Sequence, residues 1–141
     1  MTKHDVILAA VVVTHDRLDK LMVTVRRLLD EPVEYVVVVD NASTDGTATW
    51  LAEQDDPRLI LHCNAANLGG AGGFSIALQL ARDHTPANWI VVMDDDGRPQ
   101  PGAMAAFLAM NKRGWDAIGG AVFHPNGAVC EMNRPYRNPF W

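Results

Sequence analysis

The sequence has 141 residues, of which 48% are apolar and 21% are charged, and this fits one globular domain and excludes a disordered chain. A net charge of −5 at pH 7 argues against a protein that binds nucleic acid through a basic surface. Two distant cysteines exclude a disulfide scaffold or a zinc site as the organising feature, and no apolar run reaches the roughly 20 residues that a transmembrane helix needs.

Apolar runs alternate with amphipathic segments along the chain. The runs predict buried strands over residues 6–13, 33–39, 58–62, 88–93 and 115–123. The segments between them predict helices over residues 17–29, over 47–54, from a glycine-rich turn at 69–73 to about 83, and over 101–111. Asn126 and Gly127 predict a hairpin turn into residues 128–132. This order predicts an α/β fold, with a mostly parallel sheet flanked by helices and a mixed edge at the C-terminal hairpin.

The C-terminal segment, residues 133–141, differs in composition from the rest of the chain. It contains two prolines and three aromatic residues and ends on Phe140 and Trp141. Exposed aromatic side chains at the end of a domain would form an adhesive patch. We therefore expect a core over residues 1–132 and a tail over 133–141 that continues into a longer protein or docks on a partner.

Polar residues and glycines follow four of the predicted strands. In an open α/β sheet, ligands bind beyond the carboxyl ends of the strands. The segments at these positions are residues 14–17, 40–43, 64–73 and 94–96. Their composition is typical of a site for a phosphorylated ligand.

Asp94, Asp95 and Asp96 give the strongest signal. Three adjacent carboxylates repel one another, and a hard divalent ion such as Mg²⁺ or Mn²⁺ relieves that repulsion through oxygen ligands. Alternate side chains of an extended segment share a side, so we expect Asp94 and Asp96 to converge on the ion while Asp95 points elsewhere. The alternative is a solvated acidic turn that caps the following helix.

Each of the other segments also has a functional and a structural interpretation. The glycines of residues 67–73 would let backbone N–H groups approach an anion, or they would form a tight turn for helix–sheet packing. Asp40 would accept hydrogen bonds from a ribose or a base, or it would cap a helix. Arg17 would pair with phosphate oxygens, or it would be an exposed residue of the first helical turn.

Together these segments resemble family 2 glycosyltransferases of the GT-A fold. The resemblance rests on VVVTHDR at residues 11–17, VVVVDNASTDGT at 36–47, NLGGAGG at 67–73 and IVVMDDD at 90–96. The glycine run together with the three aspartates is most similar to galactofuranosyl- and rhamnosyltransferases of bacterial cell-wall synthesis. The resemblance implies metal binding by Asp94 and Asp96. The donor-binding residues that it implies are Thr14, His15, Arg17, Asp40, Asn41, Ser43, Asn67, Gly69, Gly70, Gly72, Gly73, Asp94 and Asp95.

The resemblance also implies a reaction. It is the Mg²⁺- or Mn²⁺-dependent, inverting transfer of a sugar from a UDP- or dTDP-sugar to a glycan or polyprenyl-linked acceptor, in cell-wall or polysaccharide synthesis. Because residues 1–5 lack the order of a signal peptide, we expect a cytoplasmic protein, with association at the periphery of the inner membrane as the alternative. No nucleic-acid partner is expected.

Members of this family use a downstream carboxylate as the catalytic base. Glu131 is the only carboxylate after Asp116, and it lies in no motif typical of that base. We therefore expect the base beyond Trp141, an incomplete GT-A domain that binds the donor with little or no turnover, and an acceptor-binding region that is missing. The alternative is a non-catalytic binding module or a pairing subunit.

Two other enzyme classes fit the sequence poorly. A haloacid-dehalogenase-type phosphohydrolase requires Thr or Val where this chain has Arg98, and it carries its aspartates on the first strand. A nicotinamide-dependent oxidoreductase requires glycines after the first strand, where residues 14–17 contain none.

Overall fold

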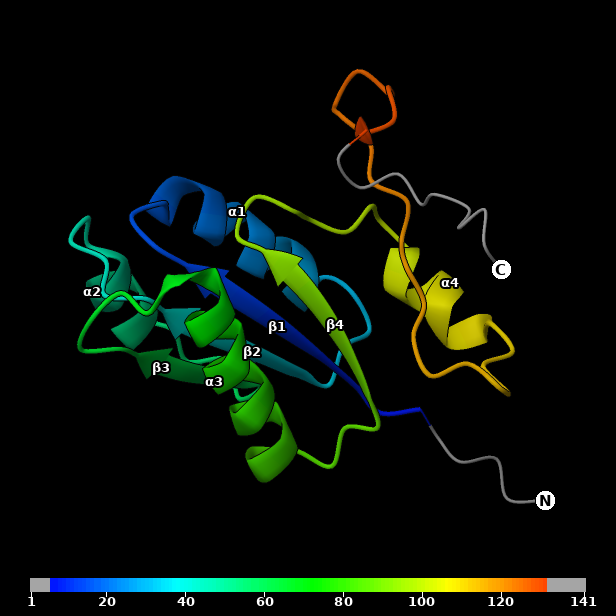
Figure 1. The fold of residues 1–141 in the computed structure, drawn as a ribbon, viewed down its shortest axis with the longest axis horizontal. Helices are drawn as coiled ribbons and strands as arrows, with labels where there is room; N and C mark the ends of the chain where they lie inside the picture. The colour runs from blue at the N-terminus through cyan, green and yellow to red at the C-terminus, as the bar shows by residue number, and fades with distance from the viewer. Residues whose placement is uncertain (1–5, 132–141) are drawn as a thin grey trace, which may run out of the picture. The chain divides into compact units, whose positions relative to one another are not determined.

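Four parallel strands form one sheet in the order β3-β2-β1-β4 in the computed structural model, which describes residues 6–131. The strands are β1 (Leu8–Thr14), β2 (Tyr35–Asp40), β3 (Leu59–Cys63) and β4 (Trp89–Asp94). The helices are α1 (Leu18–Leu29), α2 (Thr47–Ala52), α3 (Gly69–His84) and α4 (Ala103–Ala109). The strand arrows of Figure 1 point the same way, so the carboxyl ends of all four strands lie at one edge of the sheet.

The two central strands are apolar along most of their length because helices cover both faces of the sheet. Every residue of β1 is buried, and so is every residue of β2 after Tyr35. Side chains alternate between the faces of a strand, and here Val12 and Val38 join one core while Val11 and Val37 join the other. This arrangement confirms the prediction of a parallel sheet with continuous apolar strands.

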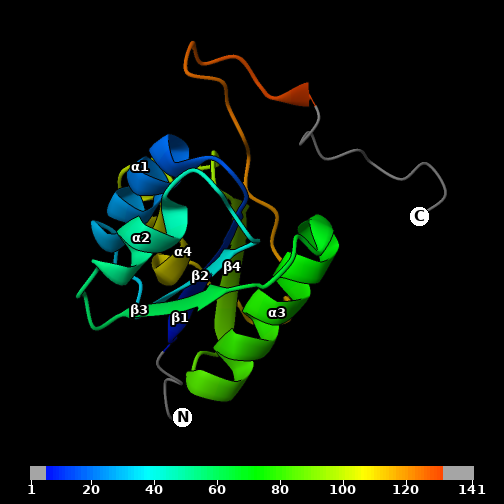
Figure 2. The same ribbon diagram turned by 90° about the vertical axis from the view of Figure 1, so that its left-hand side faces the viewer.

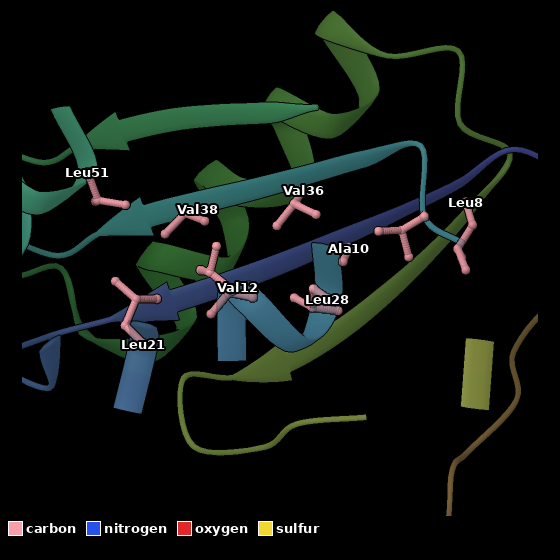
Figure 3. Close-up of a cluster of buried hydrophobic side chains, with 10 residues drawn as sticks. Leu8, Ala10, Val12, Leu21, Leu28, Val36, Val38 and Leu51 are labelled. Atoms are coloured by element: carbon pink, nitrogen blue, oxygen red, sulfur yellow. The ribbon is translucent and has the colours of Figure 1, made fainter. Parts of the chain in front are cut away.

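Helices α1, α2 and α4 cover one face of the sheet, and α3 covers the other, as Figure 2 shows. On the first face, Leu21 and Leu28 of α1 and Leu51 of α2 pack with the valines of the central strands (Figure 3). Helix α3 contributes Ala77 and Ala81 to the opposite core. The N-terminus of α3 lies towards the carboxyl edge because the helix follows the end of β3 in the chain.

The prediction of a fifth strand over residues 115–123 is wrong. The described residues from Asn111 onward form a compact unit of their own, and the only strand pairing there is an isolated antiparallel bridge between Phe123 and Val129. Gly119 and Gly120 interrupt the segment and offer no side chains for a strand to pack. The predicted mixed edge is therefore also wrong, because the described sheet is parallel throughout.

The predicted turn of this second unit is confirmed. The N–H of Gly127 donates to the carbonyl of His124, and the N–H of His124 donates to the carbonyl of Ala128, both over 2.8 Å. Gly127 has a φ of +84°, a conformation that glycine adopts without strain. The hairpin turn thus forms although the strands on either side do not.

Two further predictions concern the ends of the chain and the membrane. The proposed tail, with Phe140 and Trp141, lies outside the described residues. Across residues 6–131, no helix is both long enough and apolar enough to cross a bilayer.

Candidate functional site

The strand register brings the predicted site residues to one edge of the sheet. Thr14 at the end of β1 is paired with Asp40 at the end of β2, and Asp40 is paired with Cys63 at the end of β3. On the other side of β1, Val13 is paired with Asp94. The loops that follow these strands carry the remaining polar residues of the site.

Asp95 is the buried member of the acidic triplet. Its carboxylate accepts a hydrogen bond of 2.8 Å from the Thr14 hydroxyl and one of 3.3 Å from Nη1 of Arg17. Its main-chain carbonyl accepts a hydrogen bond of 2.6 Å from the hydroxyl of Thr24 in α1. The turn after β4 is therefore tied to both the end of β1 and the middle of α1.

Asp96 and Asp94 are exposed, in contrast to Asp95. Oδ2 of Asp96 lies 3.1 Å from Nη1 of Arg17 and 3.9 Å from Nζ of Lys20. Within the described chain, the Asp94 carboxylate has neither a hydrogen-bond partner nor an ion-pair partner. The Arg17 guanidinium bridges Asp95 and Asp96, and the expected convergence of Asp94 and Asp96 on a cation stays a prediction.

The donor set of the triplet fits a hard divalent cation. Asp94 and Asp96 present exposed carboxylate oxygens, and Mg²⁺ is commonly held by one or two carboxylates with water and substrate phosphates at its other positions. Among residues 6–131, no group of three or more His, Cys, Asp or Glu side chains is arranged to hold a metal ion. Asp94 and Asp96 could therefore hold the cation only together with oxygens from a ligand or from water.

Asn41 connects the loops that follow β2 and β3. Its Nδ2 donates to Oδ1 of Asn67 over 3.0 Å and to the carbonyl of Gly69 over 2.9 Å. Its Oδ1 accepts hydrogen bonds of 3.0 Å from Nδ2 of Asn64 and from the N–H of Leu68. The buried amide therefore uses both its donors and two acceptor positions inside the protein, and it fixes the start of α3 against the end of β2.

Asp40 is buried, and its Oδ1 accepts a hydrogen bond of 3.0 Å from the N–H of Ser43. This bond closes the turn after β2 and is not a helix cap, because α2 begins at Thr47 with Gly46 as its N-cap and no side-chain cap hydrogen bond. The exposed Cys63 lies beside Asp40. Partial burial and the neighbouring Asp40 carboxylate raise the pKa of the Cys63 thiol, which therefore stays protonated at neutral pH.

The loops after β1 and β2 are held together by reciprocal hydrogen bonds. The Asp16 N–H donates to the Ser43 hydroxyl over 2.9 Å, and the Asp16 carboxylate accepts from the Thr44 N–H over 2.6 Å. Nδ1 of His15 lies 3.0 Å from the carbonyl of Asn41. Asp16 and Ala42 both have positive φ angles, of 51° and 61°, which non-glycine residues rarely adopt. Such strain persists only where the surroundings hold it, as these bonds do.

The glycines at the start of α3 have different structural reasons. Gly69 has a φ of +70°, and a Cβ atom on Gly73 would lie 2.5 Å from Cγ1 of Val13. A Cβ atom on Gly72 would lie 2.6 Å from Cβ of Leu68. Gly70 has neither constraint, since nothing lies within 4 Å of its Cβ position. Contrary to the prediction of a turn before the helix, these glycines form the first turns of α3 itself.

Three residues of this network were not predicted as part of the site. They are Lys20, Thr24 and Asp45. Oδ2 of Asp45 accepts a hydrogen bond of 2.9 Å from the first N–H of α1, that of Leu18. A buried polar side chain such as Thr24 leaves no periodic signal, and only its bond to the Asp95 carbonyl reveals its role.

Comparison with known proteins gives consistent matches. The family model described as Glycosyl transferase family 2 matches residues 9–141. The chain is 36% identical over 139 residues to galactofuranosyltransferase GlfT1 of Mycolicibacterium smegmatis, an alignment that covers 97% of the chain and 44% of that protein. It is 35% identical over 105 residues to the undecaprenyl-phosphate mannosyltransferase of Micrococcus luteus, which covers 70% of the chain and 41% of that protein.

Solved structures share the fold. The mannosyltransferase PcManGT of Pyrobaculum calidifontis, in complex with GDP-Man and Mn²⁺, superimposes with a TM-score of 0.66 at 22% identity. The superposition covers 88% of this chain and 37% of that chain. TarS residues 1–349 of S. aureus superimpose with a TM-score of 0.63 at 21% identity, over 73% of this chain and 31% of that chain. The chain thus spans less than half the length of these relatives.

Proposed function

The chain belongs to glycosyl transferase family 2, and from this premise we propose that the carboxyl edge of its sheet binds a nucleoside-diphosphate sugar together with Mg²⁺ or Mn²⁺. In the whole protein, the sugar is transferred to a glycan or polyprenyl-linked acceptor of the cell wall. The single observation that carries the proposal is the set of charged side chains and glycines at this edge. Exposed carboxylates follow β4, two cationic side chains follow β1, and the glycine-rich start of α3 follows β3, all in the same parallel sheet.

The start of α3 supports a diphosphate site. The first N–H groups of a helix have no partners within the helix, and the helix dipole favours an anion there. Asn41 and Asn67 hold this end of α3 beside the end of β2. Since the fold does not require glycine at Gly70, its lack of a side chain supports close approach of a ligand to the backbone.

Arg17 and the acidic triplet support the other side of the site. The half-exposed Arg17 guanidinium can donate to phosphate oxygens, and Asp94 and Asp96 can hold the cation between themselves and the diphosphate. When bound, the cation supplies Lewis-acid neutralisation of the leaving nucleoside diphosphate. We assign contact with the base or the ribose to the buried Asp40, as the resemblance implies.

The donor and the acceptor follow from the relatives. The curated relatives are named for galactofuranose and mannose transfer, so we propose one of these hexoses as the transferred sugar. The name of the second relative includes undecaprenyl phosphate, which favours a lipid-linked acceptor. We place the catalytic base beyond Trp141, as the resemblance implies. The chain alone then binds the donor and transfers sugar slowly or not at all.

Calorimetric titration of the 141-residue chain with UDP, dTDP and GDP tests this proposal. Each nucleotide is titrated with Mn²⁺, with Mg²⁺ and with EDTA. We expect one of the three to bind at a single site, with affinity lost in EDTA. AMP serves as the control nucleotide because it lacks a diphosphate. Absence of binding by all three diphosphates, or binding that EDTA does not weaken, would contradict the proposed site.

A further inference from the structure

Arg17 lies where it offsets the charge of the acidic triplet. Its Nη1 is 3.3 Å from Oδ1 of Asp95 and 3.1 Å from Oδ2 of Asp96. Nζ of Lys20, one turn further along α1, is 3.9 Å from the same Asp96 oxygen. Two cationic side chains of the chain itself therefore occupy the surroundings of one of the two carboxylates predicted to hold a metal.

Asp95 differs from both of its neighbours because it is buried and both oxygens of its carboxylate are engaged. Its side chain is 5% exposed, whereas that of Asp96 is 47% exposed. The Thr14 hydroxyl occupies Oδ2, Arg17 occupies Oδ1, and the Thr24 hydroxyl occupies the main-chain carbonyl. If the Asp95 carboxylate turned outward, the buried Thr14 hydroxyl would lose its acceptor, and leaving a buried donor without a partner is unfavourable. Asp95 is thus a fixed anchor, while Asp96 is free to exchange partners.

We propose that Asp95 is a positioning residue that holds Arg17 against Asp96, so that Arg17 competes with a divalent cation for Asp96 and then faces the donor diphosphate. The claim that Arg17 faces the diphosphate rests on the proposed function, because it requires a bound diphosphate. The competition itself concerns only the cation and the residues of this chain. When Asp96 binds the cation, Arg17 keeps its bond to Asp95 and stays beside the site.

Mn²⁺ binding in the absence of nucleotide tests the competition. Paramagnetic broadening of the backbone amide signals of residues 94–97 reports the affinity, even where binding is weak. Arg17→Gln should tighten Mn²⁺ binding about two- to five-fold, the range that a half-exposed ion pair contributes. Lys20→Gln is the matched control, since it removes the same charge three residues further along the chain, from a side chain without a bond to Asp95. We expect a smaller change in this control.

Two outcomes of the Mn²⁺ experiment would overturn the proposal. Equal Mn²⁺ affinity in the parent and in Arg17→Gln would show that Arg17 does not compete for Asp96. Equal tightening in Arg17→Gln and Lys20→Gln would show only a general effect of charge. Because both changes lie on exposed parts of the site, unchanged melting temperatures without metal serve as the control for folding.

A double-mutant cycle tests the anchoring role of Asp95. The diphosphate that binds the parent chain is titrated with Mn²⁺ into Arg17→Gln, Asp95→Asn and the double variant. Asp95→Asn keeps an acceptor for the Thr14 hydroxyl. Arg17→Gln should weaken binding in the parent background and have little further effect beside Asp95→Asn. An equal loss in both backgrounds would refute the anchoring role.

The outcomes separate this inference from the proposed function. If no diphosphate binds the parent chain, the proposed function fails, while the Mn²⁺ comparison still decides whether Arg17 competes for Asp96. If Asp95→Asn does not fold, the Arg17→Gln comparison remains decisive, because it leaves the buried residues unchanged. If diphosphate binds and Arg17→Gln leaves Mn²⁺ affinity unchanged, the proposed function stands and this inference falls.

Discussion

Two glycines in the first turns of α3 lie in different surroundings, and this difference separates packing from ligand binding. A methyl group on Gly73 would lie 2.5 Å from Cγ1 of Val13 in the core strand β1. A methyl group on Gly70 would meet nothing within 4 Å. The two positions therefore form a matched pair for the same substitution.

We predict that Gly73→Ala lowers the free energy of unfolding by about 1–3 kcal/mol, because it overpacks the contact between α3 and β1. Gly70→Ala should leave stability unchanged or raise it by up to about 1 kcal/mol, because alanine favours a helix. Under the proposed function, Gly70→Ala should nevertheless weaken diphosphate binding. Thermal melts and titration calorimetry measure the two effects. Strong diphosphate binding by Gly70→Ala would argue against a ligand at this backbone.

The sequence allowed part of the site to be predicted at the scale of single residues. Asp95 was predicted to point away from the side that Asp94 and Asp96 share, and the structure shows Asp95 buried and the other two carboxylates exposed. That division depends on the Thr14 hydroxyl, a contact across 81 positions of the sequence. The role of Asn41 as a donor-binding residue stays a prediction, and the four hydrogen bonds of its amide favour a positioning role.

At the scale of elements, Asp45 joins the N-termini of two helices. Its Oδ2 accepts from the N–H of Leu18 in α1, and its Oδ1 accepts from the N–H and the hydroxyl of Thr47 in α2. Partial burial acts to raise the pKa of Asp45, but these hydrogen bonds outweigh it and hold the pKa below the ordinary value of 3.8. The ionised carboxylate is therefore the form that stabilises the fold.

A dependence of stability on pH follows from the lowered pKa of Asp45. A carboxylate with a depressed pKa contributes stability above its unfolded pKa of 3.8 and loses that contribution as the pH falls through the folded value. We predict that Asp45→Asn destabilises the chain at pH 7 and that the difference from the parent shrinks below about pH 4. Urea denaturation between pH 7 and pH 3 measures this, with the exposed Asp55→Asn as control. A difference that stays constant down to pH 3 would contradict the assignment.

Glu31 has a comparable role for α4. The buried Glu31 side chain follows α1 and accepts hydrogen bonds from the N–H groups of Gly102 and Met104, over 2.6 and 3.0 Å. We predict that Glu31→Ala costs about 1 kcal/mol, the usual effect of removing a helix cap. Amide hydrogen exchange should become faster in α4 and stay unchanged in α3. The exposed Glu53→Ala is the control, and equal protection of α4 in both variants would refute the capping role.

The elements themselves could be predicted where the apolar pattern is continuous. The apolar runs that form β1 and β2 predicted buried strands correctly, because both faces of these strands are buried and their sequences are therefore apolar without interruption. Residues 115–123 also contain apolar side chains, but Trp115 and Phe123 are exposed in the structure. A sequence pattern identifies residues that can be buried in a strand, whereas tertiary contacts decide whether they are. The start of α3 was misplaced for a related reason, since glycine-rich segments favour turns unless packing keeps them helical.

At the scale of the whole molecule, the sheet brings the polar residues and glycines of four loops to one edge. The parallel order β3-β2-β1-β4 puts β1 between the strands that carry Asp40 and Asp94. Because parallel strands end at the same edge of the sheet, residues about 80 positions apart in the sequence lie close together there. The match to glycosyl transferase family 2 and the shared fold agree with this arrangement. The central claim is that Asp94 and Asp96 bind a diphosphate through a divalent cation.

Thermal unfolding tests this claim most directly, with and without Mn²⁺, in the presence of the nucleoside diphosphate that binds the parent chain. A ligand at 100 times its dissociation constant stabilises a protein by about 2.7 kcal/mol, which gives an easily measured rise in melting temperature. We predict that the parent chain and Asp83→Ala, an exposed control on α3, show a rise that requires Mn²⁺. Asp94→Ala and Asp96→Ala should lose that Mn²⁺-dependent rise. If both variants respond to Mn²⁺ and diphosphate as the parent chain does, the acidic triplet is not the metal site and the account is contradicted.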